Sequence, residues 1–204
     1  MYIAIAGNIG SGKTTLTRLL AKNFNWEPNF ENADNNPYLS SFYEDMLRWS
    51  FNLQVFFLNS RFRQIANINK EKKSVVQDRT IYEDAYIFAA NLHAMNLMPT
   101  RDYENYLSLF ELMTSFIAAP DLLIYLRSSI PNLVSKIQKR GRDYEASIRL
   151  DYLQSLNDRY ENWIKSYTAG KLLIVNVDNL DFENNPADLA TVIESINAEI
   201  NGLF

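Results

Sequence analysis

Cysteine is absent from this chain of 204 residues, and histidine occurs once, as His93. Disulfides and thiol catalysis need cysteine, zinc sites are usually built from cysteine and histidine, and a Ser-His-Asp triad needs a placed histidine. The composition therefore excludes disulfides and thiol catalysis, and it argues strongly against a zinc site and a Ser-His-Asp triad. Lack of cysteine is typical of a protein in the reducing cytoplasm, which is where we expect this one.

Long apolar runs and an excess of basic residues are missing as well. No stretch approaches the ~20 apolar residues that cross a bilayer, and the opening MYIAIAGNIG has no basic segment ahead of an apolar run. We therefore expect no membrane span and no signal peptide. The net charge of -4 disfavours nucleic acid or a membrane surface as a partner. Any anionic ligand must be bound by a local cluster of cations.

Apolar residues are abundant, at 47% of the chain, and they follow two alternating patterns. Short β-branched or apolar runs predict strands at residues 2–6, 26–31, 74–78, 121–127 and 172–177. Helical apolar spacing lies between and after them, around 13–23, 46–69, 82–96, 101–118, 131–139, 147–168 and 187–200. Alternation of this kind predicts an α/β fold with a five-stranded parallel sheet flanked by helices on both faces. No repeat or linker interrupts it, so we expect one domain, 1–204.

Residues 7–14, GNIGSGKT, match the P-loop pattern G-x-x-x-x-G-K-[ST] between a predicted strand and a predicted helix. Its glycines let backbone amides turn toward phosphate oxygens, its lysine reaches the terminal phosphates and its Thr14 hydroxyl binds Mg²⁺. We expect ATP and Mg²⁺ as cofactors. The predicted ATP-binding residues here are Gly7, Asn8, Ile9, Gly10, Ser11, Gly12, Lys13, Thr14 and Thr15.

A P-loop alone is compatible with a kinase, a GTPase or an ATPase. The chain contains no N-K-x-D guanine-binding motif and no D-x-x-G switch, which argues against a GTPase. Asp78 ends the apolar run VVQD and Arg79 follows it, at the place where a doubly wound sheet forms its ligand crevice. Asp78 can hold the Mg²⁺ shell there and Arg79 can face the transferred phosphoryl group. The plainer interpretation is a solvated strand end with an ordinary ion pair.

The segment KIQKRGRDYE, residues 136–145, places Arg140 and Arg142 around a glycine. Fixed charge, bidentate donors and a hinge are what a mobile phosphate lid needs. Such charge runs are more often solvated surface, but the P-loop upstream favours a lid over about 138–146. Lys136, Arg140 and Arg142 are therefore further candidates for binding ATP.

Gln54, Phe57, Leu58 and Arg61 share one face of the predicted helix 46–69. An aromatic stripe at this spacing is more often core than ligand pocket, but a buried amide needs hydrogen-bond partners. A glutamine amide donates and accepts at once, which suits adenine and equally cytosine. Guanine and thymine present a carbonyl and a ring N–H on the Watson-Crick edge, where this pairing needs an exocyclic amino group.

Four segments together resemble the deoxyribonucleoside kinase family, most closely its bacterial deoxyadenosine and deoxycytidine kinases. These are GNIGSGKTT, NPYLSSFYEDMLRWSFNLQVFFLNSRFRQ, QDRTIYED and KRGRDYE, in this order within roughly residues 1–165. The resemblance implies a P-loop kinase fold and transfer of the ATP γ-phosphoryl group to the 5'-hydroxyl of a deoxynucleoside in deoxynucleotide salvage. It implies deoxyadenosine as substrate, with deoxycytidine as a second one, and a homodimer.

The resemblance also implies catalytic roles for individual residues. Glu31 would accept the proton of the 5'-hydroxyl, Arg79 would orient Glu31 and offset charge, and Lys13 would bind the phosphates. Asp78 and Thr80 depart from a Glu-Arg-Ser triplet that many members carry, which leaves open whether Asp78 touches the metal directly. Thr14 and Asp78 are the expected metal-binding residues.

Substrate roles follow from the same resemblance. Tyr43 and Glu145 would bind the deoxyribose 3'-hydroxyl, and the tyrosine ring would crowd a 2'-hydroxyl. Arg61 and Asp84 would lie near the base, on which Phe88 would stack. The full set expected at the substrate is Glu31, Tyr43, Gln54, Phe57, Arg61, Arg79, Asp84, Phe88 and Glu145.

Two alternatives remain open at this stage. A nucleoside monophosphate kinase resembling thymidylate kinase shares the P-loop, an Asp-Arg strand end and an arginine lid, but its phosphorylated acceptor would require additional cations. A non-catalytic nucleotide-binding protein on a kinase fold has no chemical need to retain Lys13, Thr14, Glu31, Asp78 and Arg79 together.

Overall fold

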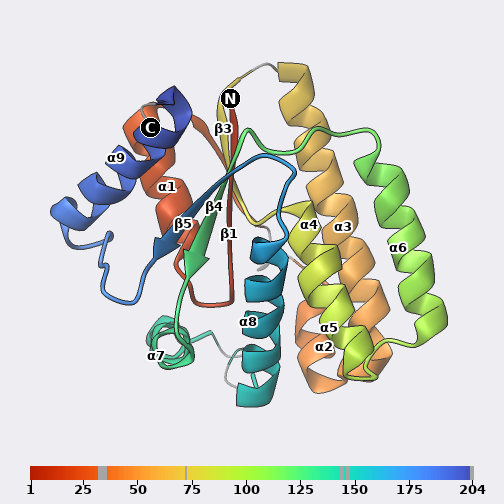
Figure 1. Ribbon diagram of the computed structural model, residues 1–204. Helices are drawn as coiled ribbons and strands as arrows, with labels where there is room; N and C mark the ends of the chain where they lie inside the picture. Colours follow the sequence, from red (N-terminus) through yellow and green to blue (C-terminus); the bar gives the residue numbers. More distant parts are fainter. Residues whose placement is uncertain (32–35, 72, 143–144, 146–147, 203–204) are drawn as a thin grey trace.

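A computed structural model describes residues 1–31, 36–71, 73–142, 145 and 148–202, and its centre is one five-stranded sheet (Figure 1). All neighbouring strands pair in parallel, in the order β2-β3-β1-β4-β5. The predicted parallel sheet is thus confirmed. The strands are β1 (Tyr2–Gly7), β2 (Glu27–Asn29), β3 (Val75–Asp78), β4 (Leu122–Arg127) and β5 (Lys171–Asn176).

Helices cover both faces of the sheet, as predicted (Figure 1). One face carries α1 (Lys13–Phe24) and α9 (Pro186–Asn201), and α7 (Ile130–Arg140) lies beyond the carboxyl end of β4. The larger group on the other face comprises α3 (Met46–Glu71), α6 (Thr100–Thr114) and α8 (Leu150–Lys165), together with α4 (Ile81–Glu83), η1 (Asp84–Ala89) and α5 (Ala90–Ala94). None of the helices in the described residues is long and apolar enough to span a bilayer.

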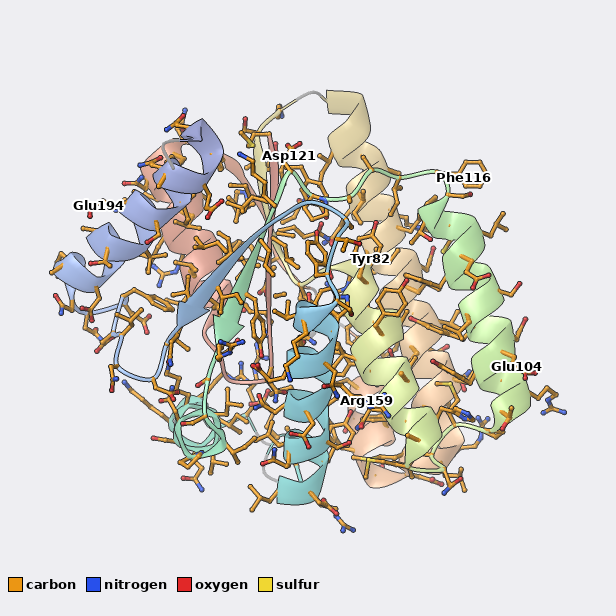
Figure 2. The ribbon with its side chains drawn as sticks, viewed as in Figure 1. Tyr82, Glu104, Phe116, Asp121, Arg159 and Glu194 are labelled. Carbon is orange, nitrogen blue, oxygen red and sulfur yellow. The ribbon has the colours of Figure 1, made fainter. Side chains whose placement is uncertain are left out.

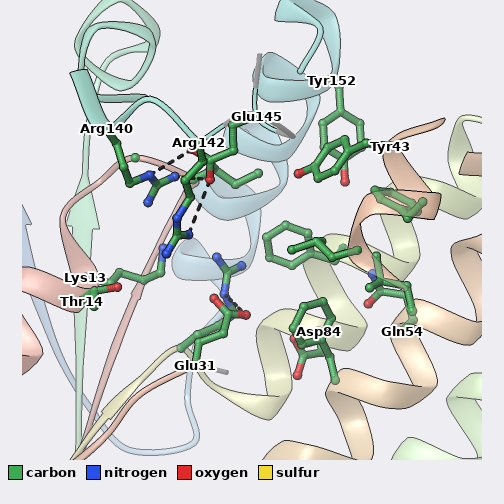
Figure 3. Close-up of a pocket in the computed structure, with 18 of the residues that line it drawn as sticks. Lys13, Thr14, Glu31, Tyr43, Gln54, Asp84, Arg140, Arg142, Glu145 and Tyr152 are labelled. Atoms are coloured by element: carbon green, nitrogen blue, oxygen red, sulfur yellow. Dashed lines mark hydrogen bonds and ion pairs between the residues drawn. The ribbon is translucent and has the colours of Figure 1, made fainter. Parts of the chain in front are cut away.

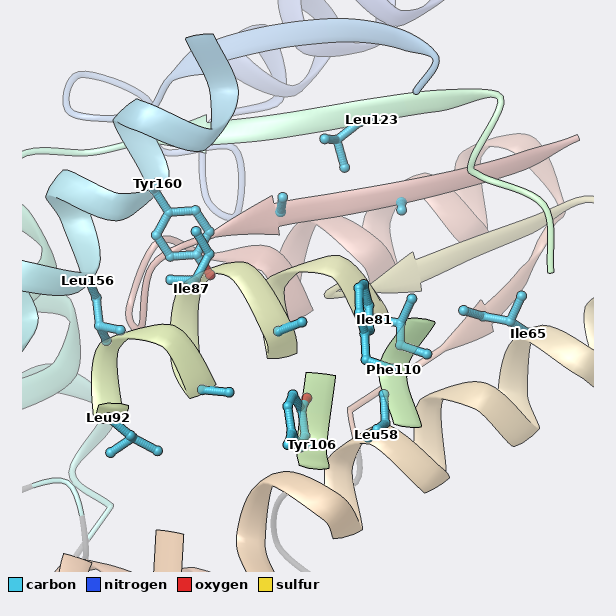
Figure 4. Close-up of a cluster of buried hydrophobic side chains, with 14 of the residues drawn as sticks. Leu58, Ile65, Ile81, Ile87, Leu92, Tyr106, Phe110, Leu123, Leu156 and Tyr160 are labelled. Atoms are coloured by element: carbon cyan, nitrogen blue, oxygen red, sulfur yellow. The ribbon is translucent and has the colours of Figure 1, made fainter. Parts of the chain in front are cut away.

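The side chains of β1 alternate between the two faces, which explains why its whole sequence is apolar. Ile3 and Ile5 pack with Leu16 of α1 and Ile196 of α9. The other face belongs to the larger core shown in Figure 4, where side chains of α3, α6 and α8 meet those of η1. A strand buried on both faces shows no polar alternation, so β1, β3 and β4 are the strands that the sequence predicts best.

Three segments differ from the predicted pattern. The short helix α2 (Leu39–Glu44) was not predicted, and the predicted helix 82–96 is divided by the π-helical turn η1. The predicted strand 26–31 is only three residues long, and it tolerates Pro28 because β2 is at the edge of the sheet. Its carboxyl end is therefore free to carry residues 30 and 31 toward the P-loop.

Candidate functional site

A single cavity runs from the P-loop to helix α3 and brings together residues from distant parts of the chain (Figure 3). Fourteen of the predicted site residues line it. These are Ile9, Gly10, Lys13, Thr14, Glu31, Tyr43, Gln54, Phe57, Arg79, Asp84, Phe88, Arg140, Arg142 and Glu145. Gly7, Asn8, Ser11, Gly12 and Thr15 belong to the loop and the helix start that form its edge, and do not line it themselves.

The P-loop has the compact shape that its glycines predict. Gly10 has a φ of 86°, and a Cβ atom there would come within 2.9 Å of both the Leu133 carbonyl oxygen and Ile137. Any side chain at this position would thus be strained and obstructed. The Lys13 amine curls back to donate to the carbonyl oxygens of Gly7, at 2.8 Å, and Asn8, at 3.0 Å.

Lys13 is buried and surrounded by charge. Burial and the neighbouring Arg79 lower its pKa to about 8, although Asp78 and other carboxylates oppose the shift. The amine is therefore close to its titration range at neutral pH. A polyphosphate beside it would favour the charged form.

Thr14, at the start of α1, meets Asp78, at the carboxyl end of β3. The Thr14 hydroxyl donates to Asp78 Oδ2 at 2.5 Å. The other carboxylate oxygen, Oδ1, is buried and has no hydrogen-bond partner among the described residues. Burial raises the pKa of Asp78, with Lys13 opposing the shift. A hydroxyl and a carboxylate with a spare buried oxygen are the hard donors that Mg²⁺ prefers, so this pair fits the metal.

Glu31 lies just past β2 and is held by two arginines. Arg61 Nη2 is 2.6 Å and Arg79 Nε 3.3 Å from Glu31 Oε1. Burial alone raises the pKa of Glu31, but Arg79, Arg61 and Lys13 outweigh it and bring the pKa to about 2. Glu31 is therefore ionised, fixed in direction and exposed to the cavity.

Arg61 does not line the cavity, in contrast to the expectation that it lies near the base. Its side chain is 2% exposed and bridges Glu31 to Asp84, whose Oδ2 lies 2.5 Å from Arg61 Nε. It also donates to the Asp78 carbonyl oxygen at 3.3 Å. Its role is to hold both carboxylates and the end of β3 in one rigid unit, from behind the cavity wall.

Arg79 has the left-handed φ of 71° that a non-glycine residue seldom adopts. Its backbone N–H stays bonded to Ile5 of β1, at 2.9 Å, while its side chain turns into the cavity. There the guanidinium lies 4.3 Å above the ring of Phe88, and Nη1 is 3.5 Å from the Tyr160 hydroxyl. Such backbone strain is typical of functional positions.

The far end of the cavity combines aromatic and amide groups from α3 and η1. Gln54 is buried, and its Oε1 accepts no hydrogen bond among the described residues. Phe57 and Phe88 supply ring faces, and Asp84 a carboxyl group whose pKa burial raises to about 6 despite the opposing charge of Arg61. A planar polar ligand with apolar faces is what these groups can bind.

At the α7 end, two arginines converge on one buried carboxylate (Figure 3). Arg140 Nε donates to Glu145 at 3.0 Å and Arg142 Nη1 lies 3.8 Å from it. Residues 143–144 and 146–147 of the predicted lid lie outside the described part of the chain. Lys136 does not line the cavity; burial lowers its pKa, and the charges acting on it are those of Asp178 and Asp181.

Several residues at the cavity were not identified from the sequence. Tyr152 lines the cavity next to Tyr43 (Figure 3), and the remaining apolar wall consists of Phe30, Leu39, Phe42 and Leu53. Glu83 lies behind the wall and bonds to Gly7. The Thr80–Glu83 spacing is a helix capping box, which could have singled out Glu83. No local signal singles out Tyr152, because its position depends on how α8 packs.

Comparison with known proteins agrees with this geometry. The family model for deoxynucleoside kinases matches residues 3–201. The deoxyadenosine/deoxycytidine kinase of Bacillus subtilis is 40% identical over 202 residues, covering 98% of this chain and 93% of the relative. The deoxyadenosine kinase of Dictyostelium discoideum is 38% identical over 95% of this chain and 78% of its own.

Solved structures give the same result. Deoxyadenosine kinase from M. mycoides with bound dATP superposes with a TM-score of 0.85 and 28% identity, over 97% of this chain and 100% of that one. The family model spans nearly the whole chain and the B. subtilis relative exceeds 30% identity over most of both sequences. The chain belongs to the deoxynucleoside kinase family.

Proposed function

We propose that this protein transfers the γ-phosphoryl group of ATP to the 5'-hydroxyl of a deoxynucleoside, with deoxyadenosine preferred and deoxycytidine as a second substrate. The observation that carries the proposal is the continuity of the cavity. Its walls include the P-loop amine of Lys13, an ionised carboxylate at Glu31 and the Gln54 amide, whose oxygen has no partner within the described residues. A nucleoside bound across this length would bring its 5'-hydroxyl to the P-loop side.

Positioning and charge neutralisation would provide most of the catalysis, since phosphoryl transfer passes through a loose transition state with little covalent demand on the protein. Lys13, Arg140 and Arg142 would hold the phosphates. Glu31 would hold the 5'-hydroxyl and accept its proton as the bond to phosphorus forms. A pKa of about 2 makes Glu31 a weak base, so orientation of the hydroxyl is its larger contribution.

Thr14 and Asp78 would hold Mg²⁺ in this proposal. Asp78 Oδ1, which has no hydrogen-bond partner in the described part of the chain, and the Thr14 hydroxyl beside it supply two oxygen donors where β3 ends and α1 begins. When bound, the ion neutralises phosphate charge. Arg79, stacked on Phe88 and directed into the cavity, would offset charge on the transferred group.

Sugar and base recognition would use the opposite half of the cavity. Tyr43 and Glu145 would hold the 3'-hydroxyl, with the tyrosine ring crowding a 2'-hydroxyl, and Gln54 would pair with adenine or cytosine next to Phe88. Arg140 now bonds to Glu145. Engagement of Arg140 by phosphate would release Glu145 for the sugar, which links donor binding to acceptor binding.

A nucleoside monophosphate as acceptor is disfavoured by the same cavity. Its phosphate would need cations at the acceptor end, and Arg61, the expected candidate, lies behind the wall with Glu31 and Asp84 as its partners. A silent nucleotide-binding subunit would have no use for an ionised Glu31 fixed between two arginines.

A homodimer in the cytoplasm, with residues 1–204 forming one domain and about 138–146 its lid, completes the proposal. Figure 2 shows Tyr82 and Arg159 on neighbouring elements and Phe116 beyond the end of the outermost helix. A groove lined by Tyr82, Tyr86, Arg159 and Trp163 supports an interface between copies on this side. Light scattering during size exclusion, which gives the mass in solution, tests the dimer.

The experiment that tests the function is phosphate transfer from Mg-ATP to deoxyadenosine, deoxycytidine, deoxyguanosine, thymidine, adenosine and dTMP, compared as kcat/KM. We expect deoxyadenosine or deoxycytidine to lead, adenosine to be clearly poorer and dTMP to be inert. Transfer to dTMP alone would support a monophosphate kinase instead. Absence of transfer to every acceptor would contradict the proposed activity.

A further inference from the structure

Glu83 is a buried carboxylate that lies outside the cavity, at the point where three segments meet. It accepts hydrogen bonds from the Gly7 N–H at 3.2 Å, the Thr80 N–H at 2.6 Å and the Tyr160 hydroxyl at 2.8 Å. Its side chain has no exposed surface. A buried carboxylate is tolerated only when its oxygens are hydrogen-bonded, and here the donors come from the P-loop, the β3–α4 turn and α8.

Only one of its two oxygens has a local task. Oε2 accepts from Thr80, and with the reverse bond from the Glu83 N–H to Thr80 Oγ1 this closes the capping box of α4. Oε1 instead bonds to Gly7 and Tyr160, which are 76 and 77 residues away in the chain. Capping the helix requires Oε2 alone, so the two bonds to Oε1 need another explanation.

Tyr160 extends the contact from Glu83 to Arg79. Its one hydroxyl proton is directed at Glu83, so toward Arg79 the oxygen can only accept, and Arg79 Nη1 lies 3.5 Å from it. Donation to a carboxylate polarises a hydroxyl and makes its oxygen a better acceptor. The guanidinium also lies 4.3 Å above the ring of Phe88, which itself packs edge to face with Tyr160. The side chain of Arg79 thus contacts both a ring and a polarised oxygen.

We propose that Glu83 is a positioning residue for phosphoryl transfer, whose buried carboxylate ties the P-loop at Gly7 to Arg79 through Tyr160. This rests on the proposed function, because it assigns Arg79 to the transferred group. Glu83 touches neither substrate in this arrangement. It fixes the first residue of the phosphate-binding loop and the charge on the acceptor side relative to each other.

The test compares Glu83→Gln, Tyr160→Phe and the double variant by kcat and by the Kd for ATP. Glutamine has nearly the same size but replaces one acceptor oxygen with a donor, so at least one of the three N–H or O–H groups loses its acceptor. We expect Glu83→Gln to lower kcat at least ~10-fold and to weaken ATP binding several-fold. Tyr160→Phe keeps the Gly7 bond, so kcat should fall while the Kd for ATP stays unchanged.

Asn185→Ala is the control for stability. Asn185 caps α9 by accepting from the Ala187 N–H at 3.1 Å, and it does not line the cavity. Loss of this cap should lower Tm without changing kcat or the Kd for ATP. In the double variant the effects on kcat should not add, since both substitutions break the same connection.

The inference is wrong if Glu83→Gln behaves like Asn185→Ala, with kcat and Kd within about twofold of the wild type, or if the two effects on kcat add in full. Should Glu83→Gln fail to fold, Tyr160→Phe decides by whether kcat alone falls. If the wild-type protein phosphorylates no deoxynucleoside, the proposed function fails separately. In that case the Kd for ATP alone tests the role of Glu83. A Kd that is unchanged in Glu83→Gln contradicts the link between Glu83 and the P-loop.

Discussion

The charge states of single residues in this site depend on burial and on the charges around them. Burial alone would raise the pKa of Glu31, yet two arginines hold that pKa at about 2. Burial and Arg79 also lower the pKa of Lys13, to about 8, and there the shift favours the neutral form. The charge of the P-loop lysine should therefore change just above neutral pH when no phosphate is bound.

Lys13 predicts a specific pH dependence of ATP binding. A lysine with a lowered pKa is charged below about pH 8 and loses its charge as the pH rises through that value. Since phosphate binding favours the charged form, affinity should fall as pH rises, by about tenfold between pH 7 and 9. Titration calorimetry with ATP across this range measures it.

Lys13→Arg provides the matched control, because arginine keeps its charge throughout this range. Its absolute affinity can differ, and the comparison concerns the slope with pH alone. A flat profile in the wild type would contradict the prediction, and the same slope in Lys13→Arg would show that another group titrates.

The sequence singled out cavity residues whose position follows from their neighbours in the chain. Lys13 and Thr14 are identified by the P-loop spacing, and Gln54 by an amide in an apolar stripe. Arg61 was expected near the base but lies behind the cavity wall, paired with Glu31 and Asp84. Which carboxylates it pairs with depends on how α3 packs in the fold, and that is not visible in the local sequence. Tyr152 went unnoticed for a similar reason, as nothing within α8 distinguishes it from a core tyrosine.

At the scale of elements, buried strands and long amphipathic helices were predictable, whereas irregular ones were not. The π-helical turn η1 interrupts a segment whose apolar spacing reads as one helix, and it carries both Asp84 and Phe88 to the cavity. Such turns occur often at functional sites. Local propensity does not reveal them, because the extra residue per turn is stabilised by packing against α3 and α8.

The end of α7 yields a prediction about the proposed lid. Arg140 lines the cavity and bonds to Glu145, so Arg140→Ala should remove a phosphate contact. We expect the KM for ATP to rise at least ~10-fold with a smaller change in the KM for deoxyadenosine. Steady-state kinetics with each substrate varied in turn gives both constants.

Arg149→Ala is the matched control for this variant. Arg149 lies just before α8, pairs with Asp151, is largely exposed and does not line the cavity. Removing it also deletes one positive charge near the proposed lid, so a general electrostatic effect would appear in both variants. Equal changes in the KM for ATP would rule out a specific contact by Arg140.

The whole molecule is built around a sheet shared by two cores. Ile196 of α9 belongs to the core on one face and Ile65 of α3 to the core on the other, and both are buried. Strand β1 contributes alternate side chains to each core, so neither can lose its packing without disturbing the other. This organisation predicts one cooperative unit for residues 1–204, with the cavity formed where the segments following β1, β2 and β3 meet.

Thermal unfolding tests that prediction. Ile65→Ala and Ile196→Ala each empty a buried site away from the cavity and should cost about 2–5 kcal/mol. For a chain of this length each should lower Tm by roughly 5–15 °C. Both variants should shift a single transition whose calorimetric and van't Hoff enthalpies agree. Two transitions, of which each variant moves only one, would mean that the faces of the sheet unfold independently and that the chain contains two units.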